Sequence, residues 1–267
     1  MTERLLGKIR AARTLGQFAW AFRNWREVWS AYRKRAPLPT FRLRGGLTIE
    51  HEPGDKPIVL FREIFLDHCY TRGGFYRPRV YDVVLDIGAN IGMFTLWLQS
   101  QARGIHVHCY EPARETRERL KRNLAANHVE RFGRVHPVAV TNVCSMVSLK
   151  RAESSGETSL FPHATTLHGA DELVSTITLA EAVALTGAAS IDFLKIDVEG
   201  SEIEIVEGAD AETWGKIERV AIEYHDLVRP GCRERVTRVL ERQGFRSIET
   251  IPVPGLPALG LIRARRK

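Results

Sequence analysis

The sequence predicts an α/β protein with a mostly parallel, twisted sheet and helices on both faces. Two observations carry this prediction. From Asp82 onward, apolar segments of strand length alternate with amphipathic segments of helical length, which is the pattern of parallel strands joined by helices. A glycine-containing turn from Gly88 to Gly92 follows the first apolar segment and opens a helix. Such turns lie at the ligand-binding edge of open α/β sheets.

The expected elements follow from this alternation. Strands are expected at 81–88, 106–112, 135–140, 145–150, 191–197, 218–225, 246–251 and 259–265. Helices are expected at 92–102, 115–128, 179–187, from 201 and at 233–245. Ser201 and Glu204 have the spacing of a capping box, and the last two strands are expected to pair antiparallel. The polar stretch 151–171 is expected to be a long loop that covers the acceptor.

The N-terminal part is expected to form two smaller units ahead of the main domain, which spans 81–267. Residues 1–36 are predicted to be a basic amphipathic helical arm, because six apolar residues recur at steps of three and four and prolines follow. The apolar residues are Leu15, Phe18, Phe22, Trp25, Trp29 and Tyr32, and the prolines are Pro37 and Pro39. Residues 37–80 are predicted to be a small α/β segment, with two short strands about Gly45 and a strand-to-helix passage at 58–70.

The charge is concentrated in the arm. Residues 1–35 hold nine Lys or Arg and two Glu, so they carry the whole net charge of +7. The remaining residues sum to zero, which argues against a general nucleic-acid partner. The aromatic face of the arm is expected to pack on the main domain or on a second protomer of a homodimer. A membrane surface and RNA stay open as alternatives.

The composition suits a soluble globular protein, with 44% hydrophobic and 27% charged residues. The four cysteines have no CxxC or metal-like spacing, which favours reduced thiols and a cytoplasmic location. We expect neither a signal peptide nor a membrane span, because no apolar run reaches ~18 residues.

The first group of candidate site residues lies around the turn. Gly88 and Gly92 permit close approach of a ligand, and the helix N-terminus suits a carboxylate or phosphate. Asp86 offers an acceptor for an ammonium group. Glu111, 25 residues later at the next strand end, can accept both hydroxyls of a ribose. The G-x-N-x-G turn differs from the G-x-G-x-x-G turn of nicotinamide enzymes, which disfavours that class.

The second group follows the strand at 191–197. Asp197 and Glu199 come at its carboxyl end, and alternation places Glu223 and His225 on one side of a neighbouring strand. Four polar groups at adjacent strand ends indicate a catalytic face. Alternatively, Asp197, Glu223 and His225 hold a divalent metal that polarises a hydroxyl, although the predicted site contains no metal.

The strings VVLDIGANIGMFT, CYEP, STITLAEA, IDFLKIDVEGSEIEIVEGA and IEYH resemble the FkbM-type methyltransferases over about residues 63–225. The resemblance implies a class I Rossmann-like methyltransferase that uses S-adenosylmethionine to methylate a hydroxyl of a sugar, glycolipid or polyketide-type natural product. Many methyltransferases bind adenine through an Asp near the third strand's end. Residues 138–140 include no Asp, so backbone atoms or Asn142 are expected to bind the adenine. The expected cofactor contacts are Asp86, Gly88, Ala89, Asn90, Gly92, Glu111, Pro112, Val140, Asn142 and Asp197.

The expected catalytic residues are Asp197, Glu199, Glu223 and His225. His225 is the first choice as general base, because a histidine works near neutral pH without a large pKa shift. The acceptor is expected to be a small molecule or a lipid-linked saccharide, the latter at the inner face of a membrane. The alternatives are a cofactor-fold binding module without activity and an RNA methyltransferase.

Overall fold

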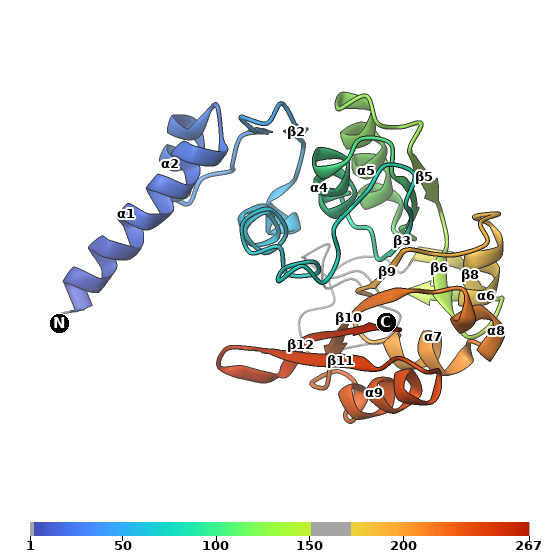
Figure 1. Cartoon of the computed structure of the whole chain (residues 1–267). Coiled ribbons are helices and arrows are strands. Elements are labelled where there is room, and N and C mark those ends of the chain that lie inside the picture. The colour runs from blue at the N-terminus through green and yellow to red at the C-terminus, as the bar shows by residue number, and fades with distance from the viewer. Residues whose placement is uncertain (1–2, 151–171, 267) are drawn as a thin grey trace.

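A computed structural model describes residues 3–150 and 172–266 of the chain (Figure 1). Its centre is a seven-stranded sheet in the order β11-β12-β10-β9-β3-β4-β5. The strands are β3 (Val83–Ile87), β4 (His106–Tyr110), β5 (Gly133–His136), β9 (Phe193–Ile196), β10 (Arg219–His225), β11 (Ser247–Val253) and β12 (Leu256–Arg265). Only β12 runs antiparallel to its neighbours in this sheet. The predicted fold class and the antiparallel final pair are therefore confirmed.

Helices cover both faces of this sheet. One face is covered by α4 (Met93–Gln101), α5 (Arg114–Ala126) and the N-terminal segments, and the other by α6 (Leu179–Ala184), α7 (Glu202–Gly208), α8 (Ala211–Gly215) and α9 (Cys232–Arg242). Successive side chains of a strand point to opposite faces. Val84 and Phe193 accordingly join the first core, while Leu85 and Leu194 join the second. Both cores are built from fully buried side chains.

The apolar stretch 135–140 was expected to be one strand, but it is divided between two. β5 ends at His136, and Val140 belongs to β6 (Ala139–Thr141), which lies in a separate three-stranded sheet. In that sheet β8 (Glu172–Thr178) pairs parallel with β6 and antiparallel with β7 (Met146–Leu149). Pro137 explains the break, because proline has no N–H to donate to a ladder. The predicted loop 151–171 lies outside the described residues.

The basic arm is two helices where one was expected. α1 (Glu3–Ala21) and α2 (Trp25–Lys34) are separated at Asn24, whose side chain donates to the Thr40 carbonyl and accepts the Arg42 N–H. Helix α2 ends at Lys34, ahead of the prolines, with the next residue in the left-handed conformation. Figure 1 shows both helices on one side of the molecule.

The central residues of the aromatic stripe pack on the segment that follows the arm, where the main domain or a second protomer was expected. Phe18 and Phe22 are buried, and the ring of Phe22 lies 4.6 Å from that of Phe61. Trp25 and Trp29 are partly buried against the same core. The short strands about Gly45 are present as β1 (Phe41–Arg42) and β2 (Thr48–Ile49), paired antiparallel.

The stretch 58–70 is helical and contains no strand, contrary to the expectation. It consists of α3 (Pro57–Phe61), after the short turn η1 (Pro53–Asp55), and a π-helical turn η2 (Arg62–Leu66). The capping box at Ser201 and Glu204 is also wrong. The buried hydroxyl of Ser201 has no hydrogen-bond partner among the described residues, and Glu204 pairs instead with Arg229, at 2.6 Å.

Candidate active site

The turn after β3 crosses the end of β9 at very short distance. A Cβ placed on Gly88 would lie 1.7 Å from the backbone oxygen of Asp197, and Gly88 has a φ of +77°. The Asp197 N–H donates to the Ile87 carbonyl at 3.0 Å. Glycine at 88 is therefore required by this backbone crossing. From the sequence, it was expected to allow the close approach of a ligand. The crossing brings the two predicted groups of site residues together.

A buried lysine ties this crossing to Asp86. The ammonium of Lys195 lies 3.3 Å from Asp86 Oδ1 and 3.4 Å from Asp197 Oδ2, and it donates to the Gly88 carbonyl at 2.9 Å. Asp86 is fully buried and also accepts a hydrogen bond from the Thr95 hydroxyl. Burial raises the pKa of Asp86, and the lysine opposes that rise. Asp86 thus already faces a cation, and its contact with a cofactor ammonium stays a prediction.

Glu111 lies at the end of β4, where the sequence predicts a ribose acceptor. Its two carboxylate oxygens accept the N–H of Asn90 at 3.0 Å and the N–H of Ala113 at 2.9 Å. Burial raises the pKa of Glu111 to about 7, although both N–H donors oppose the rise. Each carboxylate oxygen has two lone pairs, so the group retains capacity for two ribose hydroxyls. Pro112 follows it directly in the chain.

Other expected cofactor contacts lie in the same turn. The N–H groups of Gly88 and Ala89 both donate to the Tyr110 carbonyl at 3.1 Å, so these two donors are used within the protein. Asn90 adopts a left-handed φ of +49°, and its side-chain oxygen accepts the N–H of Ile91. Gly92, with a φ of +85°, precedes helix α4. The turn is therefore held rigidly before any ligand binds.

The end of the third strand differs from the expectation. Val140 is buried within the second sheet, and Asn142 is exposed just beyond it. The residue that actually ends β5 is His136, whose ring stacks on Tyr110 at 4.5 Å between centroids. The Glu111 N–H donates to the His136 carbonyl at 3.2 Å. His136 therefore lies next to Glu111, at the strand end where the adenine contact was expected.

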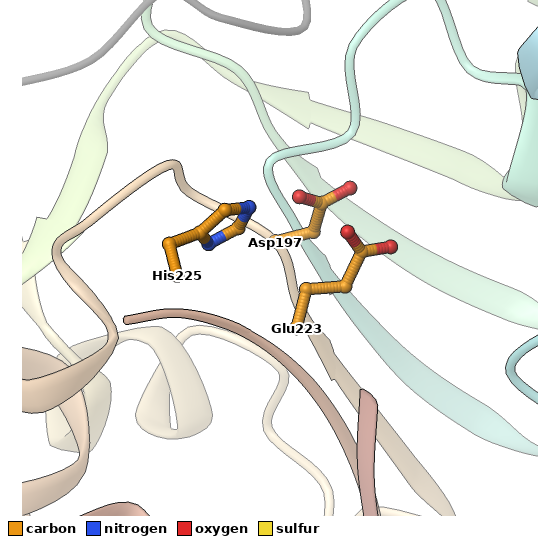
Figure 2. Close-up of side chains that lie close together, drawn as sticks. All are labelled: Asp197, Glu223 and His225. Carbon is orange, nitrogen blue, oxygen red and sulfur yellow. The ribbon is translucent and has the colours of Figure 1, made fainter. Parts of the chain in front are cut away.

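The predicted catalytic acids converge at the ends of β9 and β10. Tyr70, buried beside Phe94, donates its hydroxyl proton to Glu223 at 2.5 Å, and Asp197 lies 3.2 Å from the same hydroxyl oxygen. Asp197 and Glu223 are half-buried. Figure 2 shows their side chains beside His225, and Glu223 and His225 both belong to strand β10. The expected alternation along β10 is therefore present.

His225 is held between two further carboxylates. Its Nδ1 lies 2.8 Å from Glu202, which is fully buried, and its Nε2 lies 3.2 Å from Glu199. Burial disfavours the charged imidazole, but the hydrogen bond to Glu202 and the charges of Glu199 and Glu223 outweigh it and raise the pKa of His225. The reason for choosing His225 as general base, an unshifted pKa, is therefore wrong. Its role as base stays a prediction.

The site holds more negative than positive charge. Burial and the charge of Asp197 raise the pKa of Glu223, and burial likewise raises that of Glu199. Desolvation and Asp197 raise the pKa of Glu63, on the neighbouring η2 turn, to about 7. Burial is the largest cause in each case, so these carboxyl groups take up a proton more readily than exposed ones do.

Sequence reasoning missed three residues of this site. Lys195 stands inside an apolar strand, where a charge at a buried position is itself a signal for a paired partner. Glu202 directly follows Ser201, the expected helix start, and its local pattern gives no sign of the contact with His225. Tyr70 comes from a segment 127 residues before Asp197, and nothing in its local pattern indicates the contact.

Solved structures share this architecture. A methyltransferase FkbM from Methylobacillus flagellatus KT matches with a TM-score of 0.53 and 18% identity, over 74% of this chain and 47% of that one. The chain thus spans about half the length of that structure's chain. The strand order and the turn after β3 are those of a Rossmann-like fold.

The family follows from the sequence comparisons. The methyltransferase FkbM domain matches residues 86–247. A 31-O-demethyl-FK506 methyltransferase FkbM from Streptomyces tacrolimicus is 30% identical over 78% of this chain and 89% of its own length. A methyltransferase sdnD from Sordaria araneosa is 27% identical over 70% and 81% of the two chains. This chain belongs to the FkbM methyltransferase family, and S-adenosylmethionine is its cofactor.

Within residues 3–150 and 172–266, no helix is both long and apolar enough to cross a lipid bilayer.

Proposed function

We propose that the protein transfers the methyl group of S-adenosylmethionine to a hydroxyl of a sugar, glycolipid or polyketide-type natural product. The observation that carries this proposal is the group of carboxylates beside the cofactor turn. Asp197 lies against Gly88, and Glu223 shares the Tyr70 hydroxyl with it. An aliphatic hydroxyl needs a proton acceptor as it attacks, and a carboxylate at this position supplies one. The name of the Streptomyces relative, an O-methyltransferase acting on a natural product, agrees with this acceptor class.

The chemical step is an in-line displacement. The acceptor oxygen attacks the methyl carbon, the bond between carbon and sulfur breaks, and the hydroxyl proton passes to a carboxylate of the site. The products are a methyl ether and S-adenosylhomocysteine. Most of the rate comes from holding the two reacting atoms about 3–3.5 Å apart before reaction. The rigid turn from Gly88 to Gly92 and the buried Lys195 serve that positioning.

The cofactor's ribose is assigned to Glu111 in this proposal. Glu111→Ala removes both acceptors and should weaken S-adenosylmethionine binding by about 1–3 kcal/mol, the scale for hydrogen bonds to charged groups. Calorimetry with the full-length protein measures this change. Unchanged affinity in the variant would overturn the assignment of Glu111. If the wild-type protein does not bind S-adenosylmethionine at all, the proposed function is overturned.

The acceptor class is tested with a panel of sugar, glycolipid and polyketide hydroxyl compounds, with mass spectrometry locating the added methyl group. We expect a methyl ether, and a lower turnover in His225→Ala, because that substitution removes the imidazole that lies 3.2 Å from the carboxylate of Glu199. Glu212→Gln, at an exposed position of helix α8, is the matched control and should retain activity. A methyl group found on nitrogen, carbon or RNA contradicts the proposal. Cofactor binding without methylation of any acceptor would favour an inactive binding module.

We also propose that the arm brings the enzyme to an anionic membrane surface on the cytoplasmic side, near a lipid-linked acceptor. The central aromatic residues pack inside the chain, so the contact must use what remains exposed. Trp20 is 71% exposed, and Arg13, Arg23 and Arg26 are exposed in the same arm. Each cation near an anionic bilayer contributes up to about 1 kcal/mol, less at high salt.

Co-sedimentation with anionic vesicles tests this contact in the full-length chain. We expect salt-sensitive binding that is lost when three exposed arginines, Arg13, Arg23 and Arg26, are replaced by glutamine. These substitutions leave the packed aromatic residues in place. Binding that survives the substitutions, or no binding at low salt, contradicts the membrane role. A concentration-dependent dimer that disappears with the same substitutions would indicate the homodimer instead.

A further inference from the structure

Three side chains at the ends of β9 and β10 form a compact set of metal-binding donors. One donor atom each from Asp197, Glu223 and His225 lies within 4.8 Å of the other two. Figure 2 shows the three side chains gathered in one place, with the imidazole on one side and the two carboxylates on the other. Two carboxylates and an imidazole suit divalent ions such as Mn²⁺, which accepts both oxygen and nitrogen donors.

The imidazole is oriented as metal-binding histidines are. Its Nδ1 lies 2.8 Å from the carboxylate of Glu202, a side chain with no exposed surface, and this contact fixes the ring. Histidines that bind metals almost always donate their other ring N–H to a carboxylate, carbonyl or water in this way. His225 itself is only 6% exposed. Its Nε2 is therefore the atom directed toward the site.

The two carboxylates are also held in place by a group outside the set. The hydroxyl of Tyr70 donates its one proton to Glu223 at 2.5 Å, and Asp197 lies 3.2 Å from the same oxygen, so both carboxylates face Tyr70. Lys195, the nearest lysine, is shared between Asp197 and the fully buried Asp86. Its single charge is therefore divided between these two carboxylates.

We propose that Asp197, Glu223 and His225 bind one divalent cation of the Mn²⁺ type, and that this cation takes the acceptor hydroxyl as a further ligand. This rests on the proposed methyl transfer to a hydroxyl. The cation polarises the O–H bond, and Glu199, whose Oε2 lies 3.2 Å from Nε2 of His225, accepts the proton. The oxygen then attacks the methyl carbon and the bond to sulfur breaks. A cation replaces any proton on Nε2, because both need the same lone pair.

The test titrates MnCl₂ into the full-length protein at pH 8, after treatment with EDTA and dialysis, and follows free Mn²⁺ by electron paramagnetic resonance. We expect one saturable site. Glu223→Gln and His225→Gln should weaken it at least tenfold, and Glu202→Gln by about 10–100-fold through loss of the ring's orientation. Glu63→Gln is the matched control, because it removes a carboxylate charge near Asp197 and leaves the three donors intact. It should change the affinity less than twofold.

Each other outcome overturns the proposal. If no saturable Mn²⁺ binding occurs, the site holds no cation. If Glu63→Gln weakens binding as much as Glu223→Gln, the cation is held by diffuse negative charge and not by these donors. Thermal melting by circular dichroism identifies a variant that fails to fold. If Glu223→Gln or His225→Gln fails to fold, the Mn²⁺ affinity of the other variant tests the proposal. S-adenosylmethionine binding and methyl transfer are measured separately in EDTA. If both persist there without Mn²⁺ binding, the proposed function stands and the cation site falls.

Discussion

The close crossing at Gly88 makes a quantitative prediction about stability. In Gly88→Ala, the new Cβ would lie 1.7 Å from the Asp197 carbonyl oxygen, whereas Cβ contacts below 3.0 Å are essentially never seen. The obstacle is backbone, so β3 and β9 must separate at their carboxyl ends. Forcing extra volume into a packed site costs about 1–3 kcal/mol. A non-glycine residue at a φ of +77° costs about 1–2 kcal/mol more, so the free energy of unfolding should fall by about 2–5 kcal/mol.

Gly73→Ala is the matched control for this prediction. Gly73 has nearly the same φ, +72°, but nothing in the described part of the chain lies within 4 Å of its added Cβ. It should therefore lose only the conformational part, about 1–2 kcal/mol. Urea unfolding followed by circular dichroism measures both variants, with the midpoint and the slope reported separately. Equal losses in the two variants would refute the role assigned to the crossing.

Three further predictions follow from other contacts. Lys195→Met should lower the free energy of unfolding by about 3–5 kcal/mol, because it leaves the buried Asp86 without its cation. Lys216→Met, in an exposed pair, should cost less than about 1 kcal/mol, and equal losses would contradict the argument. Affinity for S-adenosylmethionine should fall below pH 7, because protonation of the Glu111 carboxyl, with its pKa raised to about 7, removes the charged ribose acceptor. Calorimetry should find this pH dependence absent in Glu111→Gln. If the variant shows the same pH dependence as the wild type, the role of the Glu111 carboxyl is contradicted. Asn123→Ala should cost about 1–3 kcal/mol in urea unfolding, since three backbone groups lose their partner, and a loss below about 0.5 kcal/mol would contradict this.

The sheet could be predicted from the sequence because each buried parallel strand is a short continuous apolar run with polar residues at its end. That same rule failed at 135–140, where two apolar runs belong to different sheets and only Pro137 marks the border. In the arm, the helical period predicted one helix where two are present. The steps of three and four continue across Asn24, because Phe22 and Trp25 face the same core although they lie outside a common helix.

The convergence of Asp197, Glu223 and His225 was predictable because parallel strands bring their carboxyl ends to one edge of the sheet. The partners that set the chemistry of these groups were not predictable. Glu202 reaches His225 from the start of a helix, and Tyr70 arrives from a segment with no regular period. Such contacts depend on tertiary packing, and local periodicity carries no information about them.

The strand order has a consequence for how this chain is made on the ribosome. β3 can pair with β4, and β4 with β5, as soon as these strands emerge, since they follow β3 closely in the chain. Its other edge is completed only by β9, which begins 106 residues after Ile87, once β6, β7 and β8 have also been synthesised. During that interval the backbone groups on one side of β3 are unpaired, the condition under which nascent sheets aggregate. Substitutions that weaken the β3–β9 junction should therefore reduce soluble yield during expression well before they affect the finished enzyme.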